Sequence, residues 1–226
     1  MIRVISLPPG LSGIVSLAVI ALVSGCENYY CLHGGECDPG FALGALPVPL
    51  PPPSSPENVI EALEITYNDK VRGADERLAI YAGLFTSTFI FRLQPDDVAQ
   101  GLPEQWGLRD ELGMHERLFG AQDLGDVFSI ELRVDHEPAR DLTPPVSGRA
   151  GWKEVFAPFV YLRLMFNIHE GIEVNGSQAQ FLFPPAERGR FRIAEWNDLP
   201  NPSQKTEATW GRVKLHYNPG RSHGVD

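Results

Sequence analysis

The strongest candidate for chemistry in this sequence is a histidine on an apolar helix face. His115 lies three residues after Leu112 and four before Phe119, a spacing that places all of them on one side of a helix. An imidazole there could titrate near neutral pH and exchange protons with a bound molecule. A lone histidine on an apolar face is more often a hydrogen-bonded core residue, so we assign no catalytic residue.

Three further side chains could line a cavity. Tyr161 and Arg163 share one face of an expected strand, and Arg163 could bind a carboxylate if that face is concave. The alternative is an arginine paired with Glu173 or Glu195 on a neighbouring strand. Trp106 could stack on a ligand, or it could pack as part of a lid. The candidate cavity residues are Trp106, His115, Tyr161 and Arg163.

Several classes of function are excluded by what the sequence lacks. It contains no G-x-S-x-G, no glycine-rich phosphate loop after a strand, no H-E-x-x-H and no C-x-x-C. Its six histidines are scattered without ligand spacing, so we expect no metal and no cofactor. A formal net charge of −10 without a Lys/Arg run argues against nucleic acid.

The N-terminus predicts export and a lipid anchor. Arg3 precedes an apolar run, Leu11 to Val23, which is short for a membrane span but suits a signal peptide of residues 1–25. The string Leu22-Val23-Ser24-Gly25-Cys26 resembles the lipobox of bacterial lipoproteins, which implies a diacylglycerol on the sulfur of Cys26. The alternative is ordinary cleavage nearby, with Cys26 as a structural thiol. Glu27, rather than Asp, favours the outer membrane.

The segment after Cys26 contains a second cysteine feature and a tether. Within residues 26–38, Cys31 and Cys37 are the remaining even pair in an oxidising compartment, so we expect a small disulfide loop. A metal site with His33 would lack a fourth ligand. Residues 39–55 are rich in proline and nearly uncharged, which is typical of an extended spacer.

The remaining sequence predicts helices followed by a sheet. Ser55 and Pro56 mark the start of a helix that reaches Asn68-Asp69, a second helix opens near Asp75, and a third covers Arg109 to Phe119. From Asp126 to Leu199 the pattern predicts three or four antiparallel strands, the first of which would bury Phe128, Ile130, Leu132 and Val134. We expect a strand edge or a bulge at Pro158, a bulge at Asn175-Gly176, and a turn at residues 167–171.

This order of elements resembles the NTF2-like (SnoaL-like, cystatin-like cone) superfamily. The likeness is carried by Leu78-Ala-Ile-Tyr-Ala-Gly-Leu-Phe85 with Phe89-Ile-Phe91, by Trp106-Gly-Leu-Arg-Asp-Glu-Leu112, and by Gly189-Arg-Phe-Arg-Ile-Ala-Glu-Trp196. It implies an α+β cone over residues 56–199, in which three N-terminal helices cover one face of a curved antiparallel sheet. We expect the tail, residues 200–226, to dock partly on this domain as a last strand or an arm.

Two functions are compatible with these features. The first is a non-catalytic binding or scaffolding domain of an extracytoplasmic lipoprotein, held on a bacterial membrane by its lipid. The second, implied by the resemblance, is a small-molecule enzyme (isomerase, dehydratase or hydrolase) acting in the cone with His115 and a carboxylate or Tyr161. Expected partners are the membrane, an envelope protein or a small apolar ligand, and a second copy through the sheet face.

Overall fold

The first helix of the domain begins where its capping residues predict. In the computed structural model, which describes residues 46–143, 148–201 and 209–217, helix α2 spans Pro56–Asn68. The Ser55 hydroxyl accepts a hydrogen bond from the Asn58 backbone N–H at 3.3 Å, which satisfies one of the free donors of the first turn. The apolar face of α2 is fully buried, including Ile60 and Leu63.

Among the described residues, four further helices follow, and three of them differ from the prediction. The α5 helix is longer at both ends than predicted, α4 is not among the predicted helices, and the tail, expected to dock as a last strand or an arm, docks as a helix, α6. The elements are α3 (Ala74–Gly83), α4 (Pro95–Ala99), α5 (Leu108–Asp123) and α6 (Trp210–His216).

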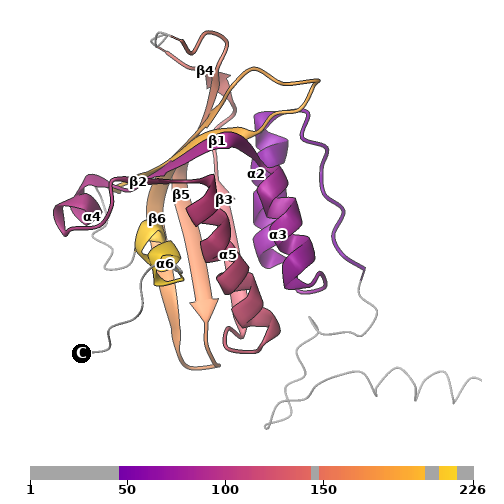
Figure 1. Ribbon diagram of the computed structural model, residues 1–226, viewed down its shortest axis with the longest axis vertical. Helices are drawn as coiled ribbons and strands as arrows, with labels where there is room; N and C mark the ends of the chain where they lie inside the picture. The colour runs from indigo at the N-terminus through magenta and orange to yellow at the C-terminus, as the bar shows by residue number, and fades with distance from the viewer. Residues whose placement is uncertain (1–45, 144–147, 202–208, 218–226) are drawn as a thin grey trace, which may run out of the picture. The chain divides into compact units, whose positions relative to one another are not determined.

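The strands form one sheet of seven strands in the order β2-β1-β7-β6-β5-β3, with β4 paired to β5. All pairings are antiparallel except that of β1 with β7, which is parallel. Figure 1 shows α2, α3 and α5 on one side of this sheet, with α6 beside α5. The strands are β1 (Phe85–Arg92), β2 (Gln105–Gly107), β3 (Ser129–Asp135), β4 (Arg140–Asp141), β5 (Lys153–Met165), β6 (Gly171–Phe183) and β7 (Ile193–Leu199).

Two bulges lie where the sequence predicts them. The register between β5 and β6 shifts between Ala157 and Val160, around Pro158, and again opposite Gly176. Gly176 has φ +80°, a conformation that costs glycine little and other residues about 1–2 kcal/mol. Because each bulge adds a residue to one strand, the pair bends and twists locally.

Side chains of α2 cover the backbone of the edge strand β3. Asn68 accepts a hydrogen bond from the Leu132 backbone N–H at 2.7 Å and donates one to the Leu132 carbonyl at 2.8 Å. The Glu64 carboxylate accepts from the Val134 N–H at 2.5 Å. Backbone hydrogen-bonding groups at the open edge of β3 are therefore bonded to side chains of a helix instead of to another strand.

The structure confirms the predicted α+β fold, an open, curved and mostly antiparallel sheet covered by helices on one face. One detail of the strand prediction is wrong. Phe128 is 40% exposed, whereas Val127 beside it is buried, because β3 starts at Ser129 and the alternation holds only from Ile130. The predicted anchor and disulfide residues, Cys26, Cys31 and Cys37, lie outside the described residues.

Candidate functional site

A fully buried carboxylate on α5 is the centre of the polar interior. Glu111 accepts hydrogen bonds from the Tyr81 hydroxyl at 2.5 Å, the Trp106 indole N–H at 2.6 Å and the Lys214 ammonium at 2.6 Å. Burial alone would raise the pKa of Glu111, but the Lys214 charge, the neighbouring His115 and the hydrogen bonds from Lys214 and Tyr81 together outweigh burial and lower it. Glu111 is therefore an ionised carboxylate in the protein core.

His115 lies one helical turn after Glu111 and is also buried. Its Nδ1 lies 2.8 Å from the Glu111 backbone carbonyl, which can only accept, so Nδ1 carries the proton. Nε2 is then the acceptor for the Tyr67 hydroxyl. Burial, helped by the nearby Lys214 charge, lowers the pKa of His115 to about 4, so the ring is neutral at neutral pH. Both ring nitrogens are occupied by groups of the chain itself.

Lys214 reaches this carboxylate from the C-terminal helix. Its ammonium nitrogen lies 3.8 Å from the ring centroid of Trp196, 3.9 Å from that of Phe91 and 5.4 Å from that of Trp210. Burial lowers the pKa of Lys214 to about 8, although the Glu111 carboxylate opposes that shift. A carboxylate and faces of aromatic rings therefore surround one cation.

The α6 helix is fixed to the domain by two more carboxylates. Asp97 accepts hydrogen bonds from the Thr209 hydroxyl at 2.5 Å and from Arg212 Nε at 2.6 Å. Asp198 accepts from the Gly211 backbone N–H at 3.2 Å. Burial, together with the charge of Asp97, raises the pKa of Asp198 to about 7.

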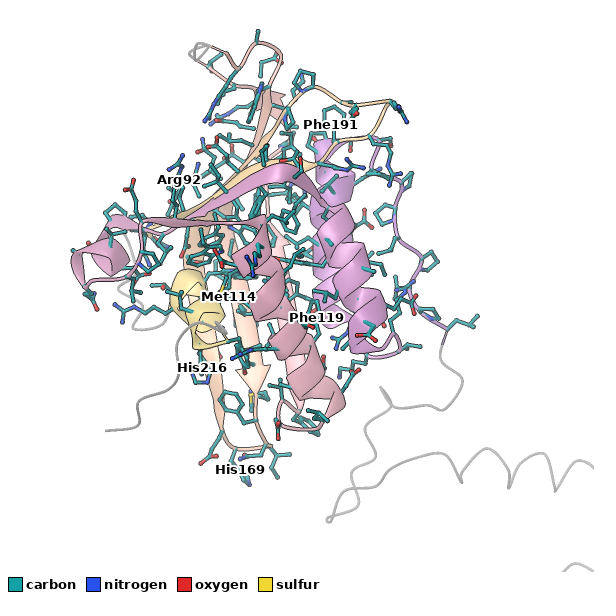
Figure 2. The ribbon with its side chains drawn as sticks, in the orientation of Figure 1. Arg92, Met114, Phe119, His169, Phe191 and His216 are labelled. Atoms are coloured by element: carbon teal, nitrogen blue, oxygen red, sulfur yellow. The ribbon has the colours of Figure 1, made fainter. Side chains whose placement is uncertain are left out.

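Figure 2 places this interior within the fold. Met114 and Phe119 mark the buried face of α5, and His216 marks α6 beside it. We call Tyr67, Tyr81, Trp106, Glu111, His115 and Lys214 the interior cluster.

The structure brings together only two of the four candidate cavity residues. Trp106 and His115 both belong to the interior cluster, where Trp106 also stacks on Phe91 with ring centroids 4.4 Å apart. Tyr161 and Arg163 do not line the interior. They lie on the other face of β5 from the buried Leu162 and Leu164.

On the outer face of the sheet, Arg163 lies beside glutamates of neighbouring strands, as the alternative to a cavity role expects. In the strand register it stands between Glu131 of β3 and Glu173 of β6. Opposite charges on neighbouring strands are a common arrangement for an exposed arginine. An alternating strand pattern alone does not determine which of its two faces lies toward the interior.

Sequence reasoning missed Glu111, Lys214 and Tyr67, which carry the interior cluster. The helix did contain a signal for the first of these. Residues 111, 114, 115, 118 and 119 form one stripe at helical spacing, and all are buried. A carboxylate in such a stripe needs a buried donor, so it points to a cation elsewhere in the chain.

A hollow lies outside the core, between α2 and β3, with a volume of about 420 Å³. Its carboxylates include Glu64 and Asp69, and Asp69 already accepts from the backbone N–H groups of Val71 and Arg72. This hollow lies where side chains of α2 cover the edge of β3. Within the described part of the chain, no group of three or more His, Cys, Asp and Glu side chains could hold a metal ion.

Comparison with solved structures finds similar folds at low sequence identity. A conserved protein from Planctomyces limnophilus is 16% identical with a TM-score of 0.43, over 63% of this chain and 91% of that one. ActVI-ORFA from Streptomyces coelicolor is 14% identical with a TM-score of 0.43, over 63% and 95%. Nuclear transport factor 2 from Cryptosporidium parvum is 15% identical with a TM-score of 0.38, over 64% and 90%.

The sequence itself gives no such match. No protein-family model matches it, and no curated protein does so either. The similar structures therefore concern the fold, and the chemistry of this chain has to be argued from its own residues.

Proposed function

We propose that the protein is a membrane-anchored lipoprotein of the cell envelope whose domain is a non-catalytic, NTF2-like binding module. One observation supports the non-catalytic part above others: the acid–base groups of the interior cluster are already bonded to one another. Glu111 holds Lys214, and His115 is held by Tyr67 and the helix backbone. A catalytic base must reach a proton of its substrate, and these groups face the chain itself.

The anchor part of the proposal rests on the lipobox-like string that ends at Cys26. Acyl chains contribute about 0.8 kcal/mol for each buried methylene, so a lipidated Cys26 would hold the domain at a membrane surface. Among the helices of the described residues, none is long and apolar enough to span a membrane.

Metabolic labelling tests the anchor directly. A clickable palmitate analogue should label the wild-type chain in a bacterial host and should fail to label Cys26→Ser. Cys31→Ser is the matched control, because it removes a neighbouring thiol and should keep the label. Label on the Cys26 variant, or none on the wild type, would remove the anchor from the proposal.

A second candidate function is a small-molecule enzyme, favoured by the collection of Glu111, His115, Tyr67 and Tyr81 in one interior. Incubation of the protein with a small-molecule extract separates the two. A binding module enriches a compound and returns it unchanged, whereas an enzyme forms a product that disappears with Glu111→Gln. A product that depends on Glu111 would replace the first proposal with the second.

A further inference from the structure

The interior holds a cation in a setting that differs from an ordinary surface ion pair. Lys214 is 3% exposed, its ammonium donates to Glu111 Oε1, and the rings of Phe91 and Trp196 lie within 4 Å of it. An ammonium can donate three hydrogen bonds, and among the described residues Glu111 is its hydrogen-bond acceptor. The aromatic faces provide the remaining stabilisation.

Carboxylate and aromatic faces are the chemistry by which proteins recognise alkylammonium ligands. We call Glu111 with Phe91, Trp196 and Trp210 the ammonium site. Glu111, Phe91 and Trp196 belong to α5, β1 and β7, which are all elements other than α6. Only Trp210 and the ammonium itself come from the C-terminal helix. Three of the four side chains of the ammonium site thus come from elements other than the helix that supplies the cation.

The contacts that hold α6 in the domain are both apolar and polar. Trp210, Val213 and Leu215 are buried in the hydrophobic core of the domain. The helix has seven residues, and its polar contacts run through Asp97 to Arg212 and Thr209 and through Asp198 to Gly211. The Arg212 side chain is 35% exposed, so water competes for its ion pair with Asp97.

Docking also leaves one polar group of α6 unsatisfied. The buried indole N–H of Trp210 has no hydrogen-bond acceptor in the structure described. An unsatisfied buried donor opposes the docked arrangement, because water would bond it when the helix leaves.

We propose that the interior is a binding site for a primary alkylammonium group, and that Lys214 of α6 is an intramolecular occupant that such a ligand displaces. This proposal rests on the binding function proposed above and names its ligand class. Glu111 accepts the ligand's N–H bonds, and Phe91 and Trp196 cover its charge.

Chemical complementation tests the site in the full-length protein. Lys214→Ala removes the atoms of n-propylammonium, so this cation should bind the variant and raise its melting temperature in a saturable way, against sodium chloride at equal ionic strength. n-Propanol, which has similar size but no charge, is the matched ligand control. Adding Glu111→Gln should weaken n-propylammonium binding by about tenfold or more, because a charge-assisted hydrogen bond is lost.

Hydrogen exchange on the wild-type chain tests displacement and does not require the variant to fold. n-Propylammonium should speed the exchange of the backbone amides of α6 and leave those of α2 unchanged. Glu111→Gln should abolish the effect of the cation on α6.

Two results overturn the proposal: equal binding of n-propanol and n-propylammonium to Lys214→Ala, or unchanged exchange of wild-type α6 at every concentration of the cation. The palmitate labelling of Cys26 is a separate measurement. Loss of the anchor would leave ammonium binding intact, and loss of ammonium binding would leave an anchored module with a ligand of another class.

Discussion

At the scale of single residues, the unusual feature is the buried ion pair of Glu111 and Lys214, at a place where apolar side chains could also fill the core. Replacing a buried pair by well-packed apolar side chains is often neutral or stabilising, so stability alone is a weak reason to keep Glu111 and Lys214. The pair does specify a geometry, since only one position of α6 brings its ammonium to the carboxylate. The ion pair therefore determines how α6 is positioned against the interior.

Asp198 gives a prediction about pH at the same scale. Its carboxyl has a pKa of about 7 in the folded protein, against an ordinary value of 3.8, mainly because of burial. Between these values the folded state keeps a proton that the unfolded state has lost. The stability that Asp198 contributes is therefore present in acid and is lost as the pH rises to about 7, by up to roughly 1.4 kcal/mol per pH unit.

Asp198→Asn keeps an oxygen for the Gly211 N–H and removes the titration. We expect the free energy of unfolding of the variant, relative to wild type, to rise from pH 4 to pH 7 and then level off, as measured by urea denaturation. His115, with a pKa of about 4, acts in the opposite direction over part of this window. It is present in both proteins, so it cancels in the difference. A difference that stays constant with pH would contradict the buried, protonated Asp198.

The sequence predicts the position of His115 but not its partners. Helical spacing puts His115 on the covered face, and that spacing depends only on residues of the same helix. Its partner Tyr67 is 48 residues away, and Lys214 is 103 residues from Glu111. Such pairs depend on the tertiary fold, which periodicity in one segment does not contain.

At the scale of elements, α2 does more than cover the sheet, because its polar side chains replace a missing strand. Asn68→Ala removes both hydrogen bonds to Leu132 and leaves the edge of β3 partly unsatisfied. We expect a loss of about 1–3 kcal/mol in the free energy of unfolding, measured by urea denaturation. Glu61→Ala, at an exposed position of the same helix, is the control and should stay within about 0.5 kcal/mol of wild type. Equal losses in both variants would show that the edge contacts contribute nothing.

The elements also show where local patterns suffice. Ser55 with Pro56 fixes the start of α2, and Gly176 fixes a bulge, because each acts on its own backbone. The large apolar side chains of the tail predict that it docks, as a last strand or an arm, but they do not predict a helix. The Thr209 hydroxyl instead accepts the Arg212 backbone N–H at 3.1 Å and caps a helix. The parallel pairing of β1 with β7 joins distant segments and has no local signal.

At the scale of the whole described domain, α6 completes the core, and this can be tested by removing it. A chain that stops after Asn201 loses the burial of Trp210 and Val213 and leaves Glu111 without its cation. Each large apolar side chain contributes about 1.5–3 kcal/mol, so we expect a fall of at least about 3 kcal/mol in the free energy of unfolding. A synthetic peptide of residues 205–218 should restore stability in trans, and the same peptide with Lys214→Met should bind about tenfold or more weakly. An unchanged urea midpoint after truncation would mean that α6 lies on a core already complete without it.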